Sequence, residues 1–233
     1  MRFLRGHWQL VLVTGLIFAL WSTPVNYPLR MIVVFLHEIS HVLSALLTGG
    51  SVDSLTLDPA EGGRVMTRGG NLFLTLTSGY LGSLVVGIAL FFIALHTHLD
   101  RWVTALFGGG TLLIAAVFVR DGFALVFCAL TGISMLLMAR FLPLSLNDLV
   151  LRVIGLSSML YVPQDIISDT ITRSHLRSDA RLLAEAFGGA TILWGGLWLA
   201  ISLAVIGLSL RYGLGPSSTL ALRRKREGTR PDP

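Results

Sequence analysis

Long apolar stretches alternate with short polar connections along most of the chain. Seven apolar segments can be traced, at about residues 8–22, 29–48, 71–95, 102–119, 122–141, 147–167 and 190–210. Several of them approach or exceed the roughly 18 residues that are typical of a membrane-spanning helix. They leave no polar faces to meet water, which argues against a soluble all-helical protein with a large core. The pattern predicts an all-α polytopic membrane protein in a lipid bilayer.

Two stretches depart from this apolar pattern. Residues 51–68 contain two short β-type runs around a turn rich in Pro and Gly, and they predict a small β-hairpin after the second helix. An irregular loop is the alternative for this stretch. Residues 168–188 are polar and are expected to lie in water. We expect a single membrane domain over residues 1–212, followed by a basic, disordered tail at 213–233.

Composition agrees with a membrane protein and limits what the positive charge can mean. Hydrophobic residues make up 53% of the 233 positions and charged residues 13%, with a mean hydropathy of +0.74, whereas soluble domains carry about 25% charged residues. The net charge of +5 comes from residues that flank apolar segments, such as Arg2 and Arg5, and from the tail between Arg223 and Arg230. Basic flanks stay on the cytoplasmic side, so we expect both termini in the cytoplasm and no binding of nucleic acid.

The second apolar segment carries a motif that can hold a metal ion. It reads His37-Glu38-Ile39-Ser40-His41, an HExxH pattern. On a helix, residues four apart share one face, so both imidazoles can bind one Zn²⁺ while Glu38 acts as general base on a water molecule. Ionisable residues inside a bilayer are costly and indicate a functional site. The alternatives are a polar patch that satisfies neighbouring helices, or a proton relay.

A catalytic zinc site needs a third protein ligand, which this motif does not supply. Asp165 and Asp169 end the sixth apolar segment and share a helix face at a spacing of four. Asp165 follows the apolar run directly and is the preferred third ligand. Asp169 is the alternative ligand, or a partner that orients one. Both acids could instead cap the helix end in the interface. Weaker candidates are expected in solvated or interfacial positions: Asp121, His7, His96, His98 and His175.

Together these features resemble the site-2 protease family of intramembrane zinc metallopeptidases. The resemblance covers most of residues 29–170 and rests on HExxH near the start of the second membrane helix, Gly49-Gly50, the hairpin, the motif Ser78-Gly79-Tyr80-Leu81-Gly82-Ser83, and a late Asp at Asp165. The usual late motif of the family, Asn-Pro-Asp-Gly, reads Pro163-Gln164-Asp165-Ile166 in this chain. The chain is most similar to the small bacterial branch without a PDZ domain, which implies a bacterial cell membrane.

The resemblance implies hydrolysis of a peptide bond in or next to a transmembrane helix of a membrane-protein substrate. A helix hides its carbonyls in hydrogen bonds, so the substrate must unwind locally, and the hairpin could offer it a strand edge at Val65 and Met66. Two other classes of function use the same polar cluster: a metal or proton transporter, and a non-proteolytic membrane binding or chaperone module. The sequence does not name the substrate, the cleavage site, the regulator or the oligomeric state.

The depths of the expected ligands predict the number of membrane crossings. His37 lies about seven residues after Arg30 and Asp165 about eighteen after Asn147, which is roughly 10 Å and 27 Å from the starts of their helices at 1.5 Å per residue. These ligands meet at one depth only if the two helices are antiparallel, which requires six crossings rather than seven. We expect the incomplete crossing within 102–141, where glycine-containing breaks interrupt the apolar pattern.

Overall fold

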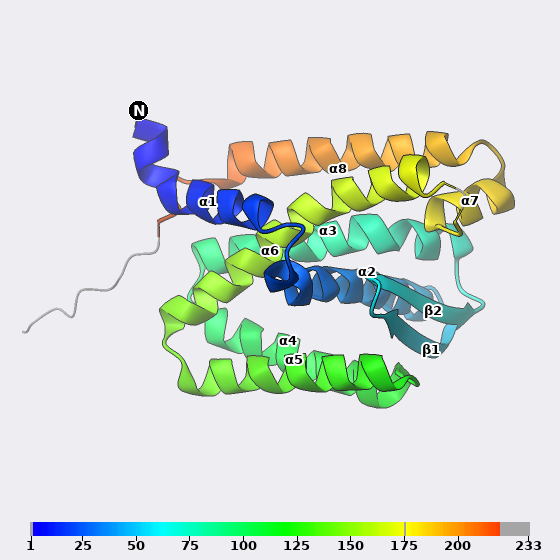
Figure 1. Ribbon diagram of the computed structural model, residues 1–233, viewed down its shortest axis with the longest axis horizontal. Helices are drawn as coiled ribbons and strands as arrows, with labels where there is room; N and C mark the ends of the chain where they lie inside the picture. The colour runs from blue at the N-terminus through cyan, green and yellow to red at the C-terminus, as the bar shows by residue number, and fades with distance from the viewer. Residues whose placement is uncertain (1, 175, 220–233) are drawn as a thin grey trace, which may run out of the picture.

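A computed structural model describes residues 2–174 and 176–219. The helices of this part are α1 Arg2–Ala19, α2 Tyr27–Leu47, α3 Leu72–His96, α4 Asp100–Phe118, α5 Gly122–Phe141, α6 Leu144–Ile167, α7 Asp179–Phe187 and α8 Thr191–Gly213. Two short helical turns, η1 Pro24–Asn26 and η2 Ser168–Thr172, adjoin α2 and α6, and two strands follow α2, β1 Ser51–Asp58 and β2 Gly62–Arg68. The helices lie side by side, with the hairpin at one end of α2 (Figure 1).

Six helices in the described residues are long and apolar enough to cross a membrane: α2 with η1, α3, α4, α5, α6 with η2, and α8. This confirms the predicted all-α polytopic fold with about six transmembrane helices. The prediction of an incomplete crossing within 102–141 was wrong, because α4 and α5 are both of spanning length. The short apolar helix is instead at the N-terminus, over Gly6–Ala19. At 1.5 Å per residue it covers roughly 20 Å, less than the ~30 Å of a hydrocarbon core.

Glycines that interrupt the apolar pattern bring helices together instead of breaking them. A Cβ at Gly108 in α4 would lie 2.7 Å from the carbonyl oxygen of Gly132 in α5, so these two backbones are in close contact. A Cβ at Gly155 in α6 would lie 2.6 Å from the carbonyl oxygen of Gly87 in α3. Lipid tails are as apolar as the helix surfaces, so burial of apolar surface does not drive membrane helices together. They associate instead through close van der Waals packing, which such small residues allow. The close packing explains why residues 102–141 form two whole helices.

The helices α2 and α6 are the first and fifth candidate spans and therefore cross in the same direction. Both run from left to right in Figure 1. The prediction that they are antiparallel was wrong. After α6 the chain continues through η2 and turns back in the short α7, which packs against α3 and α8. The end of the molecule at which α6 finishes is therefore also where α7 begins.

The hairpin predicted over 51–68 is present, and it is tied to the start of α2. The hydroxyl of Tyr27 donates to the carbonyl oxygen of Pro59 at 2.9 Å. The guanidinium of Arg30 binds both carboxylate oxygens of Glu61, at 2.8 and 2.7 Å. Both acceptors belong to the turn between the strands, so the hairpin folds back along α2 and does not project from it.

The inner face of the hairpin packs on the helices. Leu55 of β1 is fully buried and lies opposite Val65 of β2 in the antiparallel register. Leu55 also forms a parallel bridge with Val119, directly after α4. Around it, Phe35 of α2 and Ala124 of α5 belong to the same buried apolar cluster. The hairpin is therefore fixed against the membrane helices on both its turn and its apolar face.

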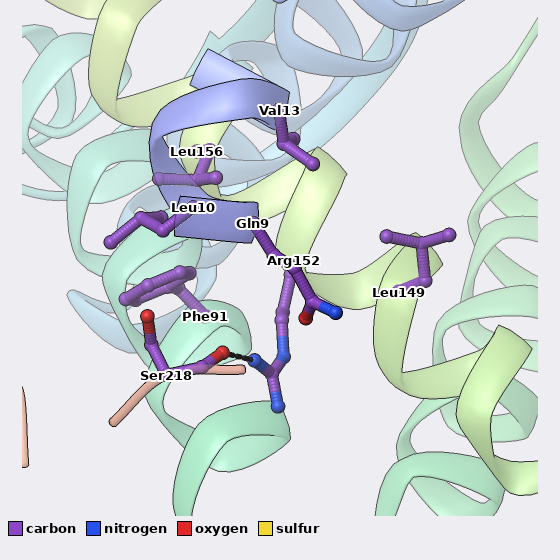
Figure 2. A pocket seen from close by; sticks show the side chains of 8 residues that line it. All are labelled: Gln9, Leu10, Val13, Phe91, Leu149, Arg152, Leu156 and Ser218. Carbon is purple, nitrogen blue, oxygen red and sulfur yellow. Dashed lines mark hydrogen bonds between the residues drawn. The ribbon is translucent and has the colours of Figure 1, made fainter. Parts of the chain in front are cut away.

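The chain returns to its N-terminal helix after α8. The backbone N–H of Ser218 donates to the carbonyl oxygen of Gly6 at 2.9 Å. The side-chain hydroxyl of Ser218 lies 2.8 Å from Nδ1 of His7, the residue at which α1 kinks. Arg152 of α6 donates to the carbonyl oxygen of Ser218 beside a small cavity, as Figure 2 shows. Residues 220–233, which hold the basic part of the predicted disordered tail, lie outside the described residues.

Candidate metal centre

The two histidines of HExxH lie on one face of α2, toward α3. Their ring centroids are 4.8 Å apart, and His41 is almost fully buried. Nδ1 of His41 lies 2.7 Å from the backbone carbonyl oxygen of Thr75. A carbonyl can only accept, so Nδ1 carries the proton and Nε2 of the neutral ring presents a lone pair, as metal-binding histidines usually do. Glu38, between them in the sequence, is also buried.

Asp179, the first residue of α7, meets both histidines. Its Oδ2 atom lies 2.9 Å from Nε2 of His37 and 3.1 Å from Nε2 of His41. One ligand atom from each of the three residues falls within 4.8 Å of the others, and this is the group of side chains in the described residues that could hold a metal ion. Burial alone would raise the pKa of Asp179, but His41 and His37 in their protonated forms hold it below its usual range through charge and hydrogen bonds.

Two glycines allow neighbouring elements to approach this centre. A Cβ at Gly79 of α3 would lie 2.4 Å from Nε2 of His37 and 2.6 Å from Nε2 of His41. A Cβ at Gly63 of β2 would lie 2.4 Å from Oε1 of Glu38. The helix α3 therefore covers the histidines and the hairpin covers Glu38. Any side chain at either glycine would occupy space that the site uses.

The structure does not bring Asp165 into the group. Its ion pair is with Arg173, at 3.5 Å. Asp169 accepts a hydrogen bond from the hydroxyl of Tyr80 at 2.6 Å and pairs with Arg173 at 2.9 Å. The ring of Tyr80 lies edge-on to that of His37, with centroids 4.8 Å apart. Asp169 thus holds a ring that packs on one of the histidines, and the geometry favours Asp179 over both acids as the third ligand.

Asp165 was preferred because it directly follows the apolar run, and that preference required α6 to run antiparallel to α2. Because α6 runs in the same direction as α2, its last turn lies beyond the depth of His37. The chain returns toward His37 only after η2, and the residue that arrives there is Asp179. Asp165 remains within electrostatic range of His37 and Asp179. It is therefore a neighbour of the centre.

Sequence reasoning had placed Asp179 in a solvated loop. A local signal for its helix does exist: the side chain of Ser178 accepts a hydrogen bond from the backbone N–H of Arg181, as a helix cap does. Ala180 and Leu183 then form a buried face. This pattern predicts a short amphipathic helix. It does not indicate that the acid at its start reaches two histidines 138 and 142 residues earlier.

The weaker candidates stay apart from this group. Asp121 caps α5, accepting from a backbone N–H of its first turn. His7 and His96 both bond to residues at or after the end of α8. His98 lies in the connection between α3 and α4. His175 lies outside the described residues.

A family model described as Peptidase M50B-like matches residues 10–209. The chain belongs to this family. The M50B-like chain is therefore a member of the site-2 protease group and an intramembrane peptidase, as the HExxH motif and the hairpin had indicated. Comparisons with curated proteins and with solved structures gave no match. Peptidases of the M50 type are zinc metalloproteases, so the donor atoms of the M50B-like chain can be tested against a zinc ion.

The donor set of this M50B-like peptidase fits zinc. Two imidazole nitrogens and one carboxylate oxygen are the ligands that catalytic zinc sites use, with a fourth position left for water. The lone pair of His41 Nε2 faces Oδ2 of Asp179 at 3.1 Å, and both atoms are acceptors. Two acceptors at this distance need a cation between or beside them, which a proton or a metal ion supplies. The buried position excludes most competing solvent.

Proposed function

We propose that this M50B-like peptidase hydrolyses a peptide bond in or next to a transmembrane helix of a membrane-protein substrate, with zinc as cofactor and Glu38 as general base. The observation that carries the proposal is the convergence of His37, His41 and Asp179 beside Glu38. This proposal takes Asp179 as third ligand in place of Asp165.

Each polar group of the centre then has one task. His37, His41 and Asp179 hold the metal, and zinc, when bound, supplies a Lewis acid that lowers the pKa of a water molecule to about 7. Glu38 takes the proton from the attacking water and delivers it to the nitrogen of the leaving amine. Gly63 lies against Glu38 and keeps bulk solvent from its carboxylate.

We propose further that the unwound substrate pairs with β2. One side of β1 is paired with β2 and the other carries the bridge from Leu55 to Val119. In the described residues, no strand pairs with the outer edge of β2. Val65 and Met66 lie in this strand, and Met66 is 51% exposed. Strand addition at such an edge gives backbone hydrogen bonds to a substrate whose own helix has opened.

The decisive experiment compares Glu38→Gln with Glu38→Asp and the wild type, reconstituted in nanodiscs. Loss of a general base lowers turnover by about 10²- to 10⁴-fold, so Glu38→Gln should stop cleavage of a transmembrane peptide while zinc stays stoichiometric by metal analysis. Cleavage that survives Glu38→Gln would refute the proposed role. The matched double variant His37→Ala, His41→Ala should lose its zinc.

The same variants test the two rival functions. A metal or proton transporter would carry metal flux in proteoliposomes and would need only the charge of Glu38, which Glu38→Asp retains. A non-proteolytic binding or chaperone module would keep its function in Glu38→Gln. The proposed protease should show no metal flux, and its activity should depend on the carboxylate itself.

A further inference from the structure

A polar cavity lies between the turn of the hairpin and the end of α6. It encloses about 460 Å³ and is lined by charged side chains from three elements, among them Arg30, Glu61, Asp165 and Arg173. This volume is within the range of ligand sites. A chain of contacts links the cavity to the metal centre: Arg173 in its wall pairs with Asp169, Asp169 accepts from the hydroxyl of Tyr80, and the ring of Tyr80 packs edge-on to His37. Glu61 in its wall is also two residues from Gly63, which covers the general base.

Most charges in the wall of the cavity already have partners. Two nitrogens of the Arg30 guanidinium donate to the carboxylate of Glu61. The third donates to backbone carbonyl oxygens of the segment before α2. Arg173 pairs closely with Asp169, at 2.9 Å. Neither guanidinium is therefore available as a whole for a further anion, and each carboxylate oxygen of Glu61 already accepts a bond from Arg30.

Asp165 is the exception among these charges. Its contact with Arg173 is 3.5 Å long, beyond good hydrogen-bond distance, and no hydrogen bond reaches it from the described residues. Because Asp165 stands on a candidate membrane span and lacks a close hydrogen-bond partner, a cationic or donor ligand is favoured beside its carboxylate. Nε of Arg173 is in addition a buried donor without a hydrogen-bond partner in the described part of the chain. The cavity thus offers both an acceptor and a donor, which suits a peptide segment better than a simple cation.

We propose that this cavity is a subsite for a lysine or arginine side chain of the substrate segment that adjoins the cleaved bond, with Asp165 as its counter-ion. The assignment rests on the proposed proteolytic function. Basic residues flank transmembrane helices, and their long side chains reach from apolar surroundings toward polar ones. Beside the strand β2, such a side chain would enter the cavity and pair with Asp165, while a backbone carbonyl of the same segment would accept from Arg173.

The test measures binding to the Glu38→Gln variant in nanodiscs, so that no peptide is consumed. Three transmembrane peptides each contain a Gly-Pro helix break. They differ at one position next to this break, where the residue is lysine, norleucine or glutamate. Hydrogen bonds to charged groups contribute about 1.5–3 kcal/mol, so the lysine peptide should bind about ten-fold or more tightly than the norleucine peptide. Adding Asp165→Asn should abolish that preference, and adding Asp165→Lys should turn it toward the glutamate peptide.

A matched control is Glu185→Gln, which removes an exposed carboxylate of α7 that pairs with Arg181 outside the cavity. It should leave the lysine preference unchanged. Equal binding of the three peptides, or a lysine preference that survives Asp165→Asn, would overturn the subsite. Loss of zinc in Asp165→Asn would do so too, since Asp165 would then be a ligand. Failure of the proposed function is distinguishable: zinc-loaded wild type would bind the lysine peptide selectively and leave it uncut.

Discussion

The Oδ2 atom of Asp179 lies 2.9 Å from Nε2 of His37, although 142 residues separate the two along the chain. The contact joins α2, a candidate membrane span, to α7, a nine-residue helix that is not one. The centre is thus completed by a short element that folds back from the end of α6. A movement of α7 would separate Asp179 from both histidines at once, so the stability of this helix bears directly on metal binding.

Asp179→Asn should cost far more zinc affinity than Asp165→Asn. Loss of a residue that only contacts a metal ligand lowers metal affinity by about 10- to 100-fold. Loss of a ligand itself should lower the affinity by more than this. The measurement is a competition titration of each purified variant against a zinc chelator. Weaker zinc binding in Asp165→Asn than in Asp179→Asn would return the third position to Asp165.

Gly63→Ala should impair cleavage without removing zinc. The added Cβ would lie 2.4 Å from Oε1 and 2.5 Å from Cγ of Glu38, so the carboxylate or the hairpin must move. A displacement of this size costs about 100-fold in a catalytic step. Gly62→Ala is the matched control, since its Cβ would meet only Cβ of Asp58, at 3.5 Å. Similar turnover of the two variants, with equal zinc, would contradict the close approach of β2 to Glu38.

Val65→Pro should reduce cleavage while metal content stays intact. Proline removes a backbone donor, and one lost hydrogen bond of about 0.5–1.5 kcal/mol weakens substrate binding by roughly 2- to 13-fold. Val65→Ala keeps the donor and serves as control for the lost side chain. Steady-state KM values for a transmembrane peptide, with zinc analysis of each variant, give the answer. Equal cleavage by Val65→Pro would refute strand pairing at this edge.

The two ends of the chain should lie on the same side of the membrane. Six candidate spans in the described residues form an even number, and the apolar part of α1, Gly6–Ala19, is not among them. Reporter domains fused after Arg5 and after residue 224 should both report the cytoplasm, as the basic flanks favour. Reporters on opposite faces would require α1 to cross, or one of the six helices to stay on one side.

The features of this protein that depend on local geometry could be predicted from its sequence. The spacing of His37 and His41 places two nitrogens on one face of any α-helix, with Glu38 beside them, so these three residues could be named without a fold. The turn at 58–63 between two β-type runs predicted the hairpin. Apolar length identified seven candidate segments, because the thickness of the bilayer sets the length of a helix that spans it. The choice of six crossings rested instead on the depths of the expected ligands.

Which acid meets the histidines depends instead on how the helices pack together. Asp165, Asp169 and Asp179 all follow the same apolar segment, and the choice among them depends on the direction of α6 and on how the chain turns back after it. That direction follows from which helices cross. It was misjudged because Asp165 was taken as the ligand, which required one incomplete crossing, and Gly108 and its neighbours were taken as the place of that break. In the folded chain, Gly108 and Gly132 instead let α4 and α5 touch. Close packing between two helices depends on the shapes of both surfaces. The residue pattern along one segment does not show which surface that segment will meet.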